Sequence, residues 1–286
     1  MNRLPLEERV RILASLCEGT SIRATQRITG AAVTTILRLL EDVGDACAAY
    51  HNENVRNLTC VRVQCDEIWS FCHAKERNIP SYKKRVGIGS LWTWVGMDSD
   101  TKLAISWVCG DRTRRFARRF ANDLADRISS FVQISTDGMH LYTEAIQYAF
   151  GYRADYGQEI KTYAQDSPDN PDTKYSPSKV LEIRRRAVWG APDLNTVSTA
   201  HIERQNLTMR MSMRRFTRLT NAFSKKVENH RRALALHFMY YNFCRVHSTL
   251  KTTPSIKHGL TDRIWTLHDL ANLPDFMRGE AADSAA

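Results

Sequence analysis

The stretch VQCDEIWSF, Val63 to Phe71, places two adjacent carboxylates inside a strongly apolar run. The surrounding residues VRVQCDEIWSF alternate and are rich in strand formers, which predicts a β-strand. Asp66 and Glu67 oppose burial there, because an ionised carboxylate leaves water at high cost unless a positive group meets it. Three alternatives remain for the group that meets these carboxylates: a basic side chain, a metal ion or, at a strand end, solvent alone. Since side chains alternate across a strand, Asp66 and Glu67 face opposite ways unless the strand bulges.

Strand and helix patterns alternate along the chain after this strand. Further strands are predicted at 91–97, 103–110, 131–138 and 158–164. Helices are predicted at 113–130, at 140–151, and from residue 198 to about 247 with a break near 222. The polar, proline-containing segments 75–85 and 166–172 are predicted to be loops. This succession favours an α/β fold.

The composition indicates a folded protein with an anionic partner. Of its 286 residues, 43% are hydrophobic, which predicts a packed core in one large domain with an appendage, or in two domains. The net charge of +10 favours nucleic acid as that partner. No apolar run reaches membrane length, and the charged N-terminus does not resemble a signal peptide. We therefore expect a cytoplasmic protein without membrane contact.

The seven cysteines are irregularly spaced and form no CxxC pair. This favours a reducing compartment over a disulfide framework. A zinc site made of Cys60, Cys65, Cys72 and His73 would lack tight ligand pairs. We expect these thiols to pack between strands instead.

The first 50 residues show a helix-turn-helix pattern. Helices are predicted at 6–19, at 22–28 with Ser21 as N-cap, and at 32–42, and Gly30 supplies the turn. We favour DNA binding over an ordinary three-helix bundle, because residues 20–40 hold three arginines and no acid. The candidate DNA contacts are Arg23, Arg27, Thr34, Thr35 and Arg38.

Two further acids are candidates for a site. Asp137 closes the predicted strand FVQISTDG, where ligands bind in open α/β sheets; alternatively, it caps the following helix. Glu203 can form neither a capping box, since residue 200 is Ala, nor an ion pair three or four positions away. We therefore expect Glu203 to interact with a group that is distant in the sequence. Nine basic residues and one acid follow it between residues 204 and 232, unlike an ordinary solvated helix face.

Three motifs in this order resemble those of the DDE transposases: CDEIWSF on a strand, STDG ending a later strand, and HIERQN opening a basic helix. With RFTRLTNAFSKK and YYNFCRVHSTLKTTPS, they look most similar to the insertion-sequence-one family of bacterial mobile elements, over residues 60–258. The resemblance implies a ribonuclease-H-like mixed sheet flanked by helices, and a catalytic, metal-binding triad of Asp66, Asp137 and Glu203. DDE families often place a basic residue seven positions after the glutamate, which here is Arg210.

The resemblance also implies a reaction, which is DNA transposition by two-metal-ion phosphoryl transfer. Two Mg²⁺ or Mn²⁺ ions suit carboxylate ligands, with Asp66 bridging both while Asp137 and Glu203 each hold one. Water would cut the ends of the element, and the freed 3′-OH would attack target DNA. The implied partners are double-stranded DNA, as terminal inverted repeats and as target, and a second copy of the chain in a homodimer or larger assembly at the bacterial nucleoid.

Neighbouring side chains have supporting roles in this hypothesis. Arg210, Arg214 and Arg215 would position phosphates. Three alternatives remain for His201: it orients a water, contacts DNA or is an inert surface residue. Glu67 either supports the metal ligands or faces solvent, and we expect solvent because the strand period separates it from Asp66.

The predicted division of the chain has four parts. They are a helix-turn-helix domain at 1–50, a linker at 51–59, a catalytic domain at 60–250, and a C-terminal extension at 251–286 that is disordered after about 278. Two features depart from the family. The long spacing between Asp137 and Glu203 implies an insertion at 152–197, and a helix-turn-helix replaces the zinc-binding cysteine cluster of many relatives.

Three other functions compete with transposition. A tyrosine recombinase would need a nucleophile such as Tyr241, but Leu234, Phe238 and Tyr241 share a helical stripe that packing explains. A transposase-derived regulator would bind DNA without catalysis, and it would have no use for three acids. A metal-dependent nuclease of the same fold would have the same triad, and only the joining of DNA ends separates the two enzymes.

Overall fold

The computed structural model describes residues 3–83, 87–164, 179–217 and 220–279. The loop predicted at 166–172, and residues 280–286 of the predicted disordered tail, lie outside these ranges. Within the ranges, no helix combines the length and the apolarity that crossing a membrane requires.

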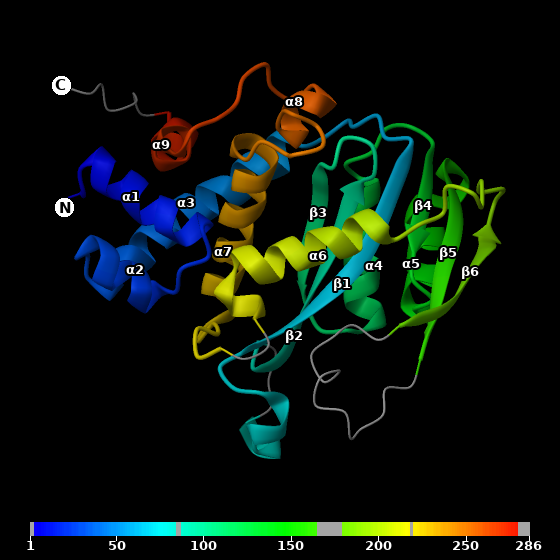
Figure 1. Ribbon diagram of the computed structural model, residues 1–286, viewed down its shortest axis with the longest axis horizontal. Coiled ribbons are helices and arrows are strands. Elements are labelled where there is room, and N and C mark those ends of the chain that lie inside the picture. Colours follow the sequence, from blue (N-terminus) through cyan, green and yellow to red (C-terminus); the bar gives the residue numbers. More distant parts are fainter. Residues whose placement is uncertain (1–2, 84–86, 165–178, 218–219, 280–286) are drawn as a thin grey trace.

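A six-stranded mixed sheet forms the centre of the molecule, in the order β3-β2-β1-β4-β5-β6 (Figure 1). The strands are β1 (Arg62–Cys72), β2 (Gly89–Asp98), β3 (Ala104–Gly110), β4 (Val132–Thr136), β5 (Ala154–Tyr163) and β6 (Val180–Trp189). β1 is antiparallel to β2 and parallel to β4, while β5 is parallel to β4 and antiparallel to β6. With helices on both faces, this order confirms the predicted ribonuclease-H-like α/β fold.

Helices cover both faces of the sheet, which explains why β1 is apolar on both sides. α4 (Arg114–Ala125) and α5 (His140–Phe150) lie behind the sheet in Figure 1, and α6 (Ala200–Ser212) crosses its front beside α7 (Val227–Met239). Cys65 belongs to the same core as Tyr142 of α5, whereas Ile68 belongs to a second core with Ile202 of α6. Odd and even side chains of β1 therefore enter different layers.

The N-terminal helices follow the predicted helix-turn-helix order. They are α1 (Leu6–Cys17), α2 (Ile22–Thr29) and α3 (Val33–Asn54). The Ser21 hydroxyl caps α2 by accepting the N–H of Ala24, and Gly30 adopts the left-handed φ of 76° that the turn requires.

The third helix is much longer than the predicted 32–42, because its second half packs on α7 beside the central sheet. Gly44 allows this approach, since a Cβ there would lie 2.7 Å from the Cβ of Arg232. Arg232 also pairs with Glu41 and Asp45 of α3. Residues 51–54 of the predicted linker are thus helical, and the division into domains remains a prediction.

Two short helices and several single turns complete the structure. α8 (Pro254–His258) and α9 (Leu267–Met277) follow α7, and α9 packs against α1 and α3. Single 3₁₀ turns occupy Glu76–Asn78 and Ser81–Lys83 in the predicted loop, Gly151–Arg153 and Arg214–Phe216, and a π-helical turn occupies Tyr240–Cys244. β5 and β6 lie in the segment predicted as an insertion, and β6 was not predicted at all.

Candidate active site

Asp66 lies in the middle of β1, and Asp137 follows the neighbouring strand β4. Gln64 and Ser135 form the last pair that joins these parallel strands, and continuing the register by two residues sets Asp66 beside Asp137. β4 ends at Thr136, so Asp137 lies at the carboxyl end of its strand, as expected of a ligand-binding residue in an open sheet.

Asp66 is a partly buried carboxylate that pairs with no basic side chain of the described residues. One of its oxygens accepts the N–H of Glu67 and the other accepts an Nδ2–H of Asn206 in α6, both at 2.8 Å. Burial, together with the negative charges of Glu67, Asp137 and Glu203, raises the pKa of Asp66 to about 8. These acids therefore lie close enough to repel one another electrostatically.

Asp137 is held by the turn that leads into α5. Its Oδ1 accepts the N–H of Met139 at 3.0 Å, and Met139 rather than Asp137 is the N-cap residue of the helix. The alternative prediction of a helix cap is therefore wrong. The second carboxylate oxygen of Asp137 has no hydrogen-bond partner among the described residues, so it is available to a ligand.

The helix that carries Glu203 is anchored to β1 at two points. Gln64 lies on the same face of β1 as Asp66, and its Oε1 accepts the N–H groups of His201 and Ile202 at 2.9 and 3.0 Å. These donors in the first turn of a helix have no partner within the helix itself. The second anchor is the bond from Asn206 to Asp66, one turn further along α6.

Glu203 interacts with a residue that is distant in the sequence, as predicted. Its Oε1 accepts a hydrogen bond from Lys161 Nζ on β5 at 2.5 Å and from Thr199 Oγ1 at 2.6 Å. Lys161 also lies 3.3 Å from the buried Glu159, which pairs with Arg185 on β6. Since 44% of the Glu203 side chain is exposed, solvent and ligands can reach it.

The residues fit a hard divalent cation, although no single position gathers all three acids. Within the described ranges, only Cys60, Asp98 and His258 bring three potential ligand atoms within 4.8 Å of one another. A pair of ions about 4 Å apart would not require such a cluster, because the outer ligands then bind different ions. Carboxylate oxygens and an uncompensated negative charge are what Mg²⁺ and Mn²⁺ prefer.

Glu67 is buried, and the expectation that it faces solvent is wrong. Its side chain is 2% exposed, because α4 and α5 cover the face of the sheet opposite Asp66. Arg112 Nη2 lies 2.5 Å from its Oε1, and the hydroxyl of Tyr142 donates to its Oε2 at 3.0 Å. Burial raises the pKa of Glu67 to about 7, and Arg112 opposes that rise.

Comparisons with known proteins give only weak similarities. No protein-family model matches the chain, and no curated protein does. Among solved structures, it is similar to a piggyBac transposase synaptic complex with hairpin DNA, at 10% identity and a TM-score of 0.38, covering 97% of this chain and 73% of that chain.

Two Mos1 structures are also similar to the chain. A pre-cleavage Mos1 transpososome has 10% identity and a TM-score of 0.29, covering 100% of this chain and 82% of that chain. A Mos1 strand transfer complex has 11% identity and a TM-score of 0.23, with 82% and 78% covered. We base no functional inference on similarities of this size.

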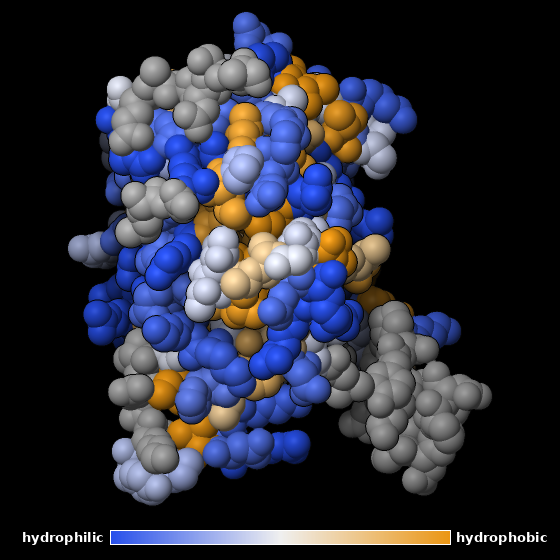
Figure 2. Space-filling model, turned by 90° about the vertical axis from the view of Figure 1, so that its left-hand side faces the viewer, coloured by the Kyte–Doolittle hydropathy of each residue, from blue (hydrophilic) through white to orange (hydrophobic). Residues whose placement is uncertain are grey.

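A basic cleft lies between the N-terminal helices and residues 71–78 and 212–237. Its volume is about 1170 Å³, and no Asp or Glu of the described chain lines it. Its basic side chains are Arg23, Arg27, Lys75, Arg77, Arg214, Arg215 and Lys225. Figure 2 shows the end of the molecule that carries α1 and α2, where hydrophilic side chains surround a hydrophobic centre. Four predicted DNA contacts thus line one cleft.

The other candidate residues lie outside this cleft. Thr34 and Arg38 are exposed on α3, Thr35 is half-buried there, and Arg210 lies in the last turn of α6, two turns after Glu203. His201 is exposed at the start of α6. Tyr241 is 6% exposed in the core around α7, which confirms that packing explains this tyrosine.

Sequence reasoning missed the residues that arrange the acids. Gln64, Asn206 and Lys161 are uncharged or basic, and their roles depend on contacts between β1, α6 and β5 that sequence spacing does not encode. One signal was present for Gln64, since it lies two residues before Asp66 and therefore on the same face of the strand.

Proposed function

We propose that this protein is a DDE transposase of the insertion-sequence-one type, which cuts the ends of a DNA element and joins their 3′-OH groups to target DNA. The observation that supports it most is the environment of the Asp66 carboxylate. This carboxylate is partly buried beside Asp137 and Glu203, its pKa is raised to about 8, and no basic side chain of the described residues compensates it. A cation bound there would offset the cost of ionising Asp66 beside the other acids.

Asp66, Asp137 and Glu203 would hold that cation as Mg²⁺ or Mn²⁺. When bound, two such ions would neutralise a DNA phosphate and activate the attacking oxygen. Asp137 offers an oxygen that has no partner among the described side chains, and Glu203 is exposed. Lys161 neutralises Glu203 in the metal-free chain, so Glu203 must share or leave this partner when it ligates an ion.

The chain's basic residues would place the DNA. The cleft between the helix-turn-helix and the catalytic unit offers cations on both walls, including Arg27 and Arg214. Contacts with phosphates fix the register of the duplex without reading its sequence. Thr34, Thr35 and Arg38 at the start of α3 would meet base edges, as the second helix of such a motif does. Two copies acting together would hold both ends of the element.

A strand-transfer assay tests the proposal. The substrate is a labelled duplex that ends in the DNA flanking the coding sequence, pre-cut to expose a 3′-OH, with supercoiled plasmid as target and Mg²⁺ or Mn²⁺. The wild type is expected to give a joined product, and Asp66→Asn and Asp137→Asn are expected to lower its yield at least 100-fold. Asp262→Asn, at an exposed acid remote from the site, is the matched control.

The same assay separates the alternatives. Cleaved but unjoined DNA would indicate a nuclease of the same fold. Equal activity in Asp137→Asn and the wild type would remove this residue from the site. Unchanged DNA binding without any reaction in the wild type, with either metal, would indicate a regulator.

A further inference from the structure

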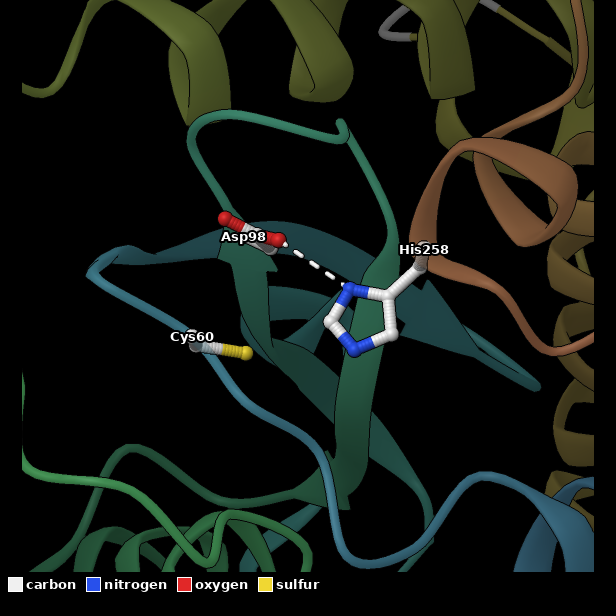
Figure 3. Close-up of side chains that lie close together, drawn as sticks. All are labelled: Cys60, Asp98 and His258. Carbon is white, nitrogen blue, oxygen red and sulfur yellow. Dashed lines mark hydrogen bonds and ion pairs between the residues drawn. The ribbon is translucent and has the colours of Figure 1, made fainter.

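A second cluster of ligand-type side chains lies at the start of β1, whereas Asp66 lies in the middle of that strand. Cys60 precedes β1, Asp98 ends β2 and His258 ends α8, and their ligand atoms lie within 4.8 Å of one another (Figure 3). Cys60 and Asp98 are 1% and 2% exposed. Cys60 and Asp66 are six residue steps apart along extended chain, which at ~3.3 Å per step is roughly 20 Å. The two groups are therefore distinct.

We infer that Cys60, Asp98 and His258 bind one transition-metal ion of the zinc type. Thiolate, imidazole and carboxylate together are zinc ligands, and the soft sulfur disfavours Mg²⁺. This set differs in kind from the all-carboxylate site around Asp66. Three protein ligands would leave a fourth position for water or a further group.

The geometry needs only a small adjustment to accept the ion. Zinc bonds of about 2.0 Å to nitrogen or oxygen and about 2.3 Å to sulfur place ligand atoms about 3.5 Å apart in a tetrahedron. The Nδ1 of His258 and the Oδ2 of Asp98 already lie 3.3 Å apart. Because all the ligand atoms lie within 4.8 Å of one another, Cys60 Sγ has to approach by at most about 1.3 Å.

Supporting contacts orient two of the three ligands. Asp98 Oδ1 accepts the N–H of Asp100 at 3.0 Å, and its Oδ2 accepts the hydroxyl of Thr101 at 2.6 Å. The hydroxyl of Ser130 bonds to the backbone of Cys60 on both sides, as acceptor from its N–H and as donor to its carbonyl. Such contacts around a metal site fix the direction of its ligands.

The Cys60 side chain packs at the edge of the main core, and a metal ion would be its only polar partner among the described residues. Its thiol makes no hydrogen bond within the described residues, unlike its backbone. Burial and the neighbouring Asp98 raise the pKa of this thiol, so it is protonated without a cation and would release its proton when the ion binds. An ion here would link α8 to the start of β1 and the end of β2. The Asp98–His258 pair alone links α8 only to β2, and more weakly.

Cobalt titration of the full chain tests this inference. The chain is stripped with chelator, dialysed and titrated with Co²⁺, which reports thiolate ligation by its charge-transfer absorption. One Co²⁺ per chain with that band is expected, and Zn²⁺ should displace it, because zinc favours tetrahedral sites with thiolate and imidazole ligands. Cys60→Ala should lose the band and at least 100-fold in affinity, and His258→Gln should weaken binding at least 10-fold.

Two controls make the result specific. Cys47→Ala removes another buried thiol, in α3, and should retain the band. Asp66→Asn should retain it too, since failure of the proposed active site would not affect this one. A folded wild type, checked by circular dichroism, that shows no thiolate band would overturn the inference, as would a band that persists in Cys60→Ala.

Discussion

Asp66 is the residue at which burial and charge conflict most directly. Its carboxylate is surrounded by the negative charges of Glu67, Asp137 and Glu203, and Asn206 gives it a neutral hydrogen-bond donor rather than a cation. Glu67 meets the same conflict on the opposite face of β1 with a cation beside it, because Arg112 pairs with it and opposes the rise of its pKa to about 7. The alternation of one strand therefore separates a compensated acid from an uncompensated one.

The uncompensated charge of Asp66 makes the metal-free chain less stable as the pH rises. Its pKa is about 8 in the folded chain against an ordinary value of 3.8, so the folded state binds the proton more tightly, and stability falls between about pH 4 and pH 8. We expect Asp66→Asn to raise the Tm at pH 8.5 in chelator by about 3 °C or more. The gain should shrink toward pH 5, as scanning calorimetry can measure.

The substitution can be accommodated locally. The Oδ1 of Asn206 is buried without a hydrogen-bond partner, so a flip of this amide lets it accept from the new amide at residue 66. Asp262→Asn should show no comparable dependence on pH. A Tm that is lower than the wild type's at both pH values would contradict the prediction, since it would mean that the charge of Asp66 is already compensated.

In the proposed site, Lys161 would compete with a metal ion for Glu203. Its ammonium group lies 2.5 Å from Glu203 and 3.3 Å from Glu159, and its side chain is 14% exposed. We expect Lys161→Met to tighten Mn²⁺ binding several-fold in calorimetric titration, because Glu203 is then released. Stability should fall by about 1–2 kcal/mol, because the buried Glu159 keeps only Arg185 as a cation.

Lys179→Met, at an exposed lysine before β6, is the matched control and should change neither quantity. The opposite result is also informative. Weaker Mn²⁺ binding in Lys161→Met would mean that the lysine positions Glu203 for the ion rather than occupying its place.

Among the elements, α6 is the one that depends most on a single strand. Gln64 accepts two backbone N–H groups of its first turn. In its second turn, the Asn206 side chain donates a hydrogen bond to Asp66. The hydroxyl of the N-cap residue Thr199 accepts no backbone N–H of the helix and donates instead to the Glu203 side chain. The position of Glu203 thus follows from a glutamine in β1.

Removing this glutamine should displace Glu203 without touching any acid. We expect Gln64→Met to lower stability by about 1–2 kcal/mol, because two N–H groups at the buried start of α6 lose their acceptor. Strand-transfer activity should fall at least 10-fold, and amide exchange should accelerate at residues 201–203. Gln147→Met, exposed on α5, is the control. Unchanged exchange at the start of α6 would show that other contacts hold the helix.

The elements that the sequence predicted are those whose buried side chains recur with a regular period. β1, which meets a different core on each face, and α4 and α5, which meet one, are of this kind. The role of Asp137 at the end of a buried strand remains a prediction. β6 was missed because its side chains are almost all exposed and include three consecutive arginines, so no alternation marks it. Glu67 was misplaced because a strand covered on both faces leaves no solvent side, which depends on helices far along the chain.

At the scale of the whole molecule, the long helix α3 and its close approach to α7 at Gly44 fix α1 and α2 relative to the central sheet. The cleft between them has Arg23 and Arg27 on one wall and Arg214 and Lys225 on the other. The sequence motifs do not predict this cleft, because its shape depends on how α3 packs on α7. The two predicted DNA-binding segments are therefore parts of one surface.

If a single duplex occupies the cleft, charge reversal on either wall should weaken binding by a similar amount. We expect Arg27→Glu and Arg214→Glu each to lower affinity for double-stranded DNA at least 10-fold at physiological salt. Each should also reduce the slope of log K against log[salt] by about 0.9 for every phosphate that the side chain no longer neutralises. Fluorescence anisotropy over a range of salt concentrations measures both, with Lys257→Glu on α8 as the control. Loss of binding in Arg27→Glu but not in Arg214→Glu would mean that the N-terminal helices bind DNA alone, and that the cleft does not enclose it.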